Sequence, residues 1–230
     1  MCSMDGKMMD GITQVYADAW LLAVDKPAGL LVHGDGTGAR TLTDLVREAT
    51  GIACAQAVQR LDSETTGLVL FSLDKEVQPA LDAAVVSGAV RKRYIALVAG
   101  RLAGGERTID AAIGRDRHDA RRMRVSKTGK HAATIVRPLA RYGNATLVEL
   151  ELLTGRRHQI RVHMASIGHP VVGDALYQGP ASKGGLMLHA LEERLVHPVT
   201  SEELLLRTAW PPRFADTPVP AGHEWSILMP

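Results

Sequence analysis

Asp62 is the first side chain whose surroundings in the sequence suggest chemistry. It follows Arg60 by two residues, and the polar run Ser63-Glu64-Thr65-Thr66-Gly67 then leads into the apolar stretch GLVLFSL. A carboxylate beside an arginine is most often a structural ion pair. Here the polar run places the carboxylate in a loop at the mouth of a buried strand, and loops on a rigid scaffold often carry function. We therefore treat Asp62 as a candidate catalytic group.

A second cluster, TGRRHQIRVH, contains Arg157, His158 and Arg161. The pattern predicts a helix over residues 157–167, ended by the glycine and proline that follow. On that helix Arg157 and Arg161 share a face, where like charges repel. An anionic partner is expected to compensate them, either a protein carboxylate or a phosphate.

The histidines of this cluster raise the alternative of a metal site. His158 and His163 are five residues apart and point to different helix faces, unlike the i, i+4 pair of a zinc protease helix. The two cysteines, Cys2 and Cys54, form no Cys-x-x-Cys pair. We expect no metal and no disulfide framework, which fits a reducing cytosol.

Positive charge is concentrated in residues 114–130. This block, GRDRHDARRMRVSKTGK, carries seven Lys or Arg and two Asp, a net charge of +5, while the other residues carry 20 basic and 23 acidic side chains. A basic block on a near-neutral body can bind anions, although a solvated loop is as common. Its basic residues are Arg115, Arg117, Arg121, Arg122, Arg124, Lys127 and Lys130.

The composition and the periodicity predict an α+β protein. With 230 residues and 46% hydrophobic residues the chain can form a single domain over residues 1–230, with residues 1–12 flexible. It has no signal-peptide pattern and no apolar run long enough to span a membrane, so we expect a cytoplasmic protein. Strands are expected at 20–24, 30–33, 67–73, 94–99, 145–153 and 186–196, and helices at 41–49 and at 75–86, the latter capped by Asp74. The tail at 211–220 is expected to be extended on the surface.

Five motifs together resemble the RluA-type pseudouridine synthases. QRLDSETTGLVLFSLD is similar to the family's catalytic motif HRLDxxTSG, and TGRRHQIRVHMASIGHPVVGDALY to its other long signature. DKPAGLLVH, KRYIALVAG and LMLHALEERLVHP are further matches in the family's order, over residues 20–200. Short motifs have high false-positive rates, but five ordered matches are strong evidence.

The resemblance implies a fold and an active site. The fold is a mixed, mostly antiparallel sheet flanked by helices, with an active-site cleft across it and no N-terminal RNA-binding domain. Asp62 takes the place of the essential aspartate, Tyr94 that of the tyrosine packing on the target base, and Arg161 that of its basic partner. Arg60 matches an arginine that displaces the flipped nucleotide. The family needs no cofactor.

Two positions depart from the family pattern. Gln59 replaces the histidine that usually precedes Arg-Leu-Asp, and Thr66 replaces a serine. Glutamine keeps a donor and an acceptor, and threonine keeps a hydroxyl. We expect activity to survive, without any role that is special to an imidazole at position 59.

The resemblance also implies RNA as the partner, either tRNA, rRNA or both, bound by a monomer. RNA is recognised through phosphates and splayed bases in loops and stem-loops. The expected contacts are the basic block together with Arg60, Arg91, Lys92, Arg93, Arg157 and His158.

Two other functions remain open on the sequence. The first is a non-catalytic RNA-binding or folding factor on the same scaffold. The second is an acid/base hydrolase that uses Asp62 and Glu64. Residues at i and i+2 do not face each other across a bond as the paired carboxylates of a glycosidase do, which disfavours the second function.

Overall fold

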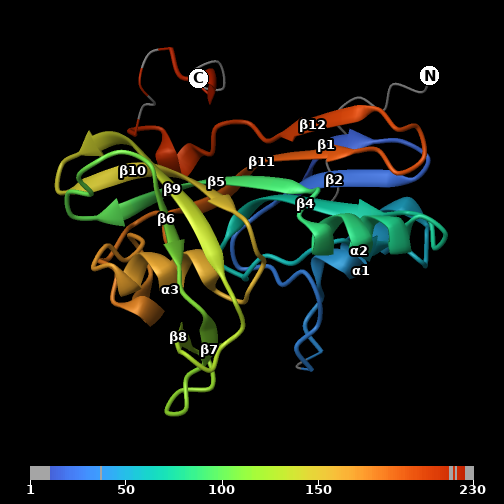
Figure 1. Ribbon diagram of the computed structural model, residues 1–230. Helices are drawn as coiled ribbons and strands as arrows, with labels where there is room; N and C mark the ends of the chain where they lie inside the picture. Colours follow the sequence, from blue (N-terminus) through green and yellow to red (C-terminus); the bar gives the residue numbers. More distant parts are fainter. Residues whose placement is uncertain (1–10, 37, 218–219, 221, 226–230) are drawn as a thin grey trace. The chain divides into compact units, whose positions relative to one another are not determined.

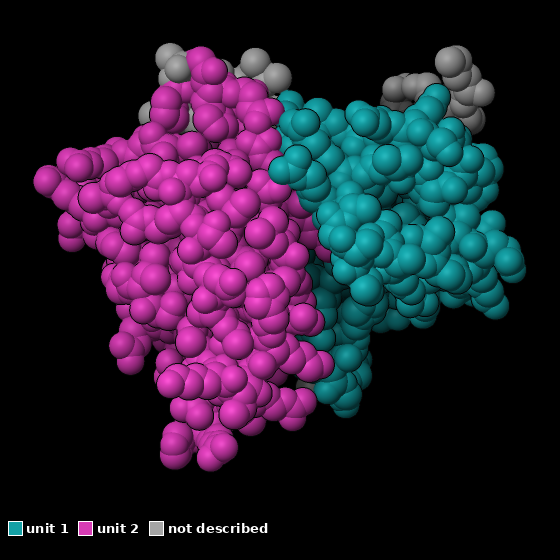
Figure 2. All heavy atoms as spheres, in the orientation of Figure 1, with its two compact units in different colours: residues 1–91, 190–208 teal, residues 92–189, 209–230 magenta. Residues whose placement is uncertain are grey.

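The computed structural model describes residues 11–36, 38–217, 220 and 222–225. These residues divide into two compact units, which Figure 2 colours separately. The first unit comprises residues 1–91 and 190–208, and the second comprises 92–189 and 209–230. Both units are α+β and their paired strands are mostly antiparallel, so the predicted fold class is confirmed. A division into two units fits one domain with two lobes, and the single domain stays a prediction.

The first unit is built on the strand order β1-β2-β4-β11, with β3 beside β4 and β12 beside β11. The pairs β1–β2, β2–β4, β3–β4 and β11–β12 are antiparallel. The strands are β1 (Thr13–Ala17), β2 (Leu21–Lys26), β3 (Gln56–Ala57), β4 (Thr66–Ser72), β11 (Leu188–Val196) and β12 (Glu203–Arg207). Every residue of β4 is buried, as its largely apolar sequence predicts.

Helices α1 (Leu42–Thr50) and α2 (Gln78–Ser87) cover one face of these strands (Figure 1). Thr41 and Asp44 form a capping box that begins α1, and Gly51 ends it with a left-handed φ of 71°. Leu81 of α2 packs with Leu68 and Leu70 of β4 in the core of this unit. The helix predicted at 41–49 is thereby confirmed.

The second unit is built on the strand order β5-β10-β9-β6. The pairs β5–β10, β10–β9 and β9–β6 are also antiparallel. The strands are β5 (Arg91–Ala99), β6 (Arg107–Asp110), β9 (Ala133–Tyr142) and β10 (Ala145–Leu152). Helix α3 (Gln159–Ser166) lies against one face of them (Figure 1), where His163 bonds Thr134 of β9.

The basic block forms a hairpin in the second unit. Strands β7 (Ile113–Arg115) and β8 (Met123–Val125) pair with each other, and Ile113 also forms a bridge with Lys130. We call residues 113–130 the basic hairpin. Its base packs on α3 and on the short 3₁₀ helix η1 (Ala175–Tyr177), through Ile113, Val162 and Tyr177.

Several predicted elements differ in the structure. Residues 30–33 form no strand, because the backbone N–H groups of Leu42 and Thr43 take up the carbonyls of Leu31 and Val32. Asp74 does not cap α2, which begins at Gln78, and instead accepts a hydrogen bond from the Glu76 N–H.

The two ends of the chain also differ from the predictions. The tail at 211–220 is not simply extended, because η2 (Pro212–Phe214) buries Phe214 completely. Ile12 is 1% exposed, so the predicted flexible start does not include it, and residues 1–10 lie outside the described part. Within the described part no helix is long and apolar enough to cross a membrane.

His189 in β11 makes the stability of the fold depend on pH. Burial, and then the charge of Arg213, lowers the pKa of His189 to about 3. An unfolded histidine titrates near pH ~6.5, so the unfolded chain binds the proton more readily. The contribution of neutral His189 to the free energy of unfolding should be fully present above pH ~6.5. It should be lost as the pH drops toward 3, with a loss of about 2–3 kcal/mol at pH ~4.5. Denaturant unfolding at pH ~6.5 and pH ~4.5 measures this loss. The free energy of unfolding of His189→Leu should depend less on pH than that of the wild-type chain, whereas exposed His118→Leu should match the wild type.

Candidate active site

Asp62 lies in a tight loop between β3 and β4 of the first unit. The N–H of Thr65 donates to the Asp62 carbonyl at 3.1 Å and closes a turn. Leu61 is 6% exposed and anchors the loop in the core, while Asp62 is half-buried and Arg60 is exposed. The loop therefore presents a carboxylate and an arginine from a rigid base.

Lys26 anchors this loop through a buried hydrogen bond to the Ser63 carbonyl. Its side chain is completely buried at the end of β2, and Nζ donates to the carbonyls of Pro27, Leu30 and Ser63, each at 2.8 Å. Three N–H donors meet three acceptors, which offsets the cost of burying the charge. Lys26 was not among the predicted site residues; its signal in the sequence was a lysine that ends an apolar strand directly before proline.

Gly67 brings the loop close to β11. It has a φ of +112°, and a Cβ at this position would lie 2.2 Å from the Ala190 carbonyl oxygen. Only glycine fits both the backbone angle and the space. The polar run after Asp62 must therefore end in glycine for β4 to lie against β11.

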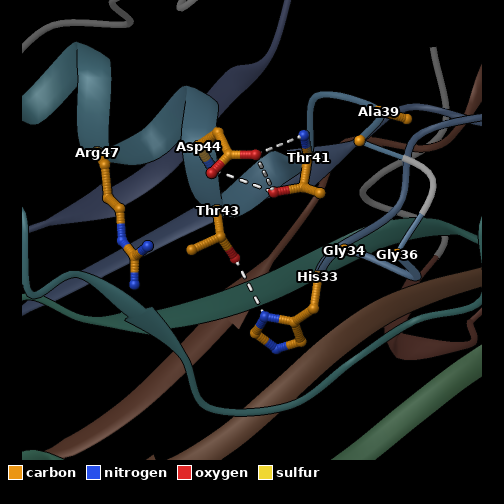
Figure 3. Close-up of a pocket in the computed structure, with 9 residues that line it drawn as sticks. His33, Gly34, Gly36, Ala39, Thr41, Thr43, Asp44 and Arg47 are labelled. Carbon is orange, nitrogen blue, oxygen red and sulfur yellow. Dashed lines mark hydrogen bonds between the residues drawn. The ribbon is translucent and has the colours of Figure 1, made fainter.

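A hollow of about 520 Å³ lies beside α1 in the first unit (Figure 3). The Thr43 hydroxyl donates to the Val32 carbonyl at 2.7 Å, so His33 Nδ1, 3.3 Å away, must donate to that hydroxyl. Partial burial, then the charges of Arg60 and Arg47, lower the pKa of His33. His33 is thus neutral at pH 7, and Nε2 is left as a hydrogen-bond acceptor.

Gln59, which stands where the family has histidine, donates from Nε2 to Glu193 of β11. Glu193 is 1% exposed. A neutral amide here supplies the donor that a buried carboxylate requires. Gln59 thus supports the loop from the side of the sheet.

Tyr94 lies in β5 of the second unit and is 6% exposed. It pairs directly with Leu150 of β10, which in turn pairs with Val136 of β9. Directly paired residues project from the same face of a sheet. Thr134, two residues before Val136, is on this face and bonds α3, so Tyr94 projects toward the side of the sheet that α3 covers.

Arg161 is held by a carboxylate of its own unit. Its Nε and one terminal nitrogen bond the two oxygens of Asp174 at 2.7 and 2.9 Å, and both side chains are buried. Such a bidentate pair fixes the plane of the guanidinium group. A protein carboxylate as partner was one of the expected alternatives.

The prediction that Arg157 and Arg161 share a helix face is wrong. Helix α3 begins at Gln159, and His158 before it has a left-handed φ of 57°. Arg157 lies outside the helix, is exposed, and donates to the Arg121 carbonyl at 3.2 Å. It therefore belongs with the basic hairpin.

Arg93 contacts carboxylates and an indole ring. It bonds Glu149 at 2.5 Å and Glu224 at 2.5 Å, and its guanidinium lies 4.6 Å from the Trp225 ring centroid. Arg137 bonds the same Glu149 at 2.8 Å. These contacts give Arg93 a structural role, and we leave it out of the RNA surface proposed below.

The basic hairpin exposes most of its charge. Arg121 bonds Asp119, and this hydrogen bond lowers the pKa of Asp119 to about 2. Arg122 is half-buried, with its guanidinium 5.4 Å from the Tyr177 ring centroid. The exposed basic residues are Arg115, Arg117, Arg121, Arg124, Lys127 and Lys130.

Histidines of the second cluster bond protein groups. Both ring nitrogens of His163 are occupied, one by the Thr134 hydroxyl and one by the Ala111 carbonyl, each at 2.9 Å. His158 Nδ1 contacts the Tyr177 hydroxyl at 2.8 Å. Among the described residues, no three or more His, Cys, Asp or Glu side chains are grouped to hold a metal ion.

The profile of the family described as RNA pseudouridylate synthase matches residues 20–166. The chain belongs to this family. The RNA pseudouridine synthase YhcT of Bacillus subtilis, described as uncharacterized, is 37% identical over 205 residues, which cover 86% of this chain and 68% of that protein. Ribosomal large subunit pseudouridine synthase D of Xylella fastidiosa is 38% identical over 218 residues, covering 90% and 65%. The chain thus spans about two thirds of the length of these relatives.

A solved structure supports the same assignment. Human RNA pseudouridylate synthase domain containing 1 has a TM-score of 0.74 with this chain at 27% identity, covering 90% of this chain and 87% of that one. The predicted RluA-type family and its activity, isomerisation of uridine in RNA, are confirmed. Of the predicted catalytic residues, Asp62 lies in the first unit with Arg60, and Tyr94 and Arg161 lie in the second.

Replacement of Lys26 by methionine should leave three buried carbonyls without their donor. We expect a loss of about 2–4 kcal/mol in the free energy of unfolding and a mobile Asp62 loop. Denaturant unfolding measures the first effect, and hydrogen exchange of residues 60–66 the second. Lys75→Met, at an exposed position of the same unit, should change neither. Unaltered exchange in this loop would contradict the anchoring role.

Proposed function

We propose that the chain converts specific uridines in stem-loops of tRNA, large-subunit rRNA or both to pseudouridine, with Asp62, Tyr94 and Arg161 as its catalytic residues. The observation that carries this assignment is the placement of Asp62 in a loop held by Lys26 and closed by Gly67. A preorganised carboxylate is what attack on a sugar, or assistance to a leaving base, requires.

The reaction is an isomerisation. The uracil N1–C1′ bond breaks, the base turns, C5 bonds to C1′, and the C5 proton is lost while N1 gains one. No redox carrier enters this balance. The target base must first leave its stack, which costs a few kcal/mol and least in a loop. In the proposal Asp62 reacts as a carboxylate, Tyr94 packs on the uracil near C5, and Arg161 supplies the positive charge that keeps a carboxylate ionised.

Four groups of residues are proposed to bind the RNA. The exposed arginines and lysines of the basic hairpin, with Arg157 beside them, supply charge for the phosphates. Arg60 is proposed to fill the place of the flipped base. In the hollow beside α1, His33 Nε2 and Arg47 offer an acceptor and a charge to a neighbouring nucleotide. Arg91 and Lys92 stay in the proposal as positive charge at the start of β5.

We further propose that the enzyme acts as a monomer in the cytoplasm. For the compartment, the support is the two cysteines without a paired motif, which fit a reducing environment.

Asp62→Asn should fold normally and form no pseudouridine, because the amide cannot act as a carboxylate. Tritium release from uridine-labelled RNA should fall by at least about 10³-fold. The matched control is Glu64→Gln, an exposed carboxylate two residues away, which should keep most activity. RNA binding that persists without turnover in the unchanged chain would favour the non-catalytic alternative.

Neutralising the basic hairpin should weaken RNA binding in a salt-dependent way. With Arg124, Lys127 and Lys130 replaced by alanine, the affinity for stem-loop RNA should drop at least about tenfold, and the slope of log affinity against log salt by about 2. Fluorescence anisotropy across a salt series measures both. A control that removes three exposed charges elsewhere, from Lys75, Arg101 and Lys183, should lose much less affinity. Equal losses in the two variants would count against the hairpin.

A further inference from the structure

Tyr177 connects three parts of the second unit. It is 5% exposed in η1, and its apolar cluster includes Ile113 of β7 and Val162 of α3, with Met123 of β8 packed against it. Tyr177 therefore shares one apolar cluster with both strands of the basic hairpin and with the helix that carries Arg161. No role for this residue was predicted from the sequence, and the family match gives it none.

The Tyr177 hydroxyl bonds the hairpin to the start of α3. It accepts a hydrogen bond from the Met123 N–H at 2.9 Å, and it lies 2.8 Å from His158 Nδ1. A phenol has one proton and two lone pairs, so it can accept from Met123 while its own proton goes to an imidazole nitrogen. Loss of this oxygen would leave the hairpin held to α3 mainly by apolar packing.

The ring and backbone of Tyr177 act on Arg161. The Arg161 guanidinium lies 5.2 Å from the ring centroid, a cation–π distance. The Tyr177 N–H donates to Asp174 at 3.2 Å, the carboxylate that holds Arg161 in a bidentate pair. Arg122 of the hairpin also lies near the ring, at 5.4 Å. Tyr177 thus contacts Arg161 both directly and through Asp174.

We propose that Tyr177 is a positioning residue, which transmits engagement of RNA by the basic hairpin to the orientation of Arg161. The inference rests on the proposed roles of the hairpin and of Arg161. Phosphate contacts fix the hairpin; Met123 and Arg122 then hold Tyr177 in one place. Asp174 and the Arg161 guanidinium are then held in place as well, because the Tyr177 N–H and ring that they contact no longer move. Binding of RNA by the hairpin thereby also orients the Arg161 guanidinium.

Tyr177→Phe tests this link, because it keeps the ring and removes the two hydrogen bonds. The single-turnover rate at saturating RNA should fall about tenfold, as the loss of one to two hydrogen bonds predicts. With Tyr177 intact, replacing Arg124, Lys127 and Lys130 of the hairpin by alanine should lower both the affinity for RNA and the rate at saturating RNA. In the Tyr177→Phe background the same variant should lower only the affinity. Tyr142→Phe, at an exposed tyrosine of the same unit, should behave as the unchanged chain.

Hydrogen exchange tests the link without catalysis. Tyr177→Phe should speed exchange of the Met123 amide and of peptides over residues 159–177, and stem-loop RNA should protect these peptides less than in the unchanged chain. Unchanged exchange there, or equal effects of the hairpin variant on the saturated rate in both backgrounds, would overturn the proposal. If the wild-type chain formed no pseudouridine, the proposed function would be contradicted instead. The exchange data would still decide whether Tyr177 joins the hairpin to Arg161.

Discussion

The buried charges of Lys26 and Arg161 are each matched by directed hydrogen bonds, and the candidate site depends on that constraint. An ammonium or guanidinium group loses its water on burial, and only well-placed acceptors offset the loss. Lys26 meets this requirement with three carbonyls, one of them next to Asp62. Arg161 meets it with both oxygens of Asp174. The same bonds that make burial tolerable leave these side chains with little freedom, which is what a preorganised site needs.

Sequence alone predicted the elements in which local pattern and tertiary burial agree. The strand at 67–73 is a nearly continuous apolar run, and the strand at 145–153 alternates in part. The strand at 186–196 carries His189 and three charged residues among its apolar ones, and the helix at 41–49 has its capping threonine. Strand β9 was missed because only three of its ten residues are buried, so it carries no clear periodicity. The start of α3 was misplaced because Gln159 accepts hydrogen bonds from the Thr154 hydroxyl and the Arg156 N–H, which hold the preceding residues in a non-helical loop.

The site residues divide in the same way. Asp62, Tyr94 and Arg161 were found by resemblance to a family, because each lies in a motif that can be read along the chain. Lys26, Asp174 and Tyr177 also lie in matched motifs, DKPAGLLVH and the long signature that ends in GDALY, but the motifs alone gave these residues no role. Their roles arise from partners that are distant along the chain: Ser63 is 37 residues from Lys26, and Met123 is 54 residues from Tyr177. Long-range partners are a property of the fold, which local spacing does not encode.

The alternation of β5 separates two roles that the run RKRY presents as one basic patch. Glu151 is paired directly with Arg93, and Leu150 with Tyr94, so the two neighbours project from opposite faces of the sheet. Arg93 enters a cluster with Glu149, Glu224 and Trp225, while Tyr94 projects to the face where α3 carries Arg161. The carboxylates on Arg93 therefore lie across the sheet from Tyr94 and Arg161. An ion-pair cluster on that face can hold the strand in place without placing negative charge beside Tyr94 and Arg161, where it would repel a phosphate backbone.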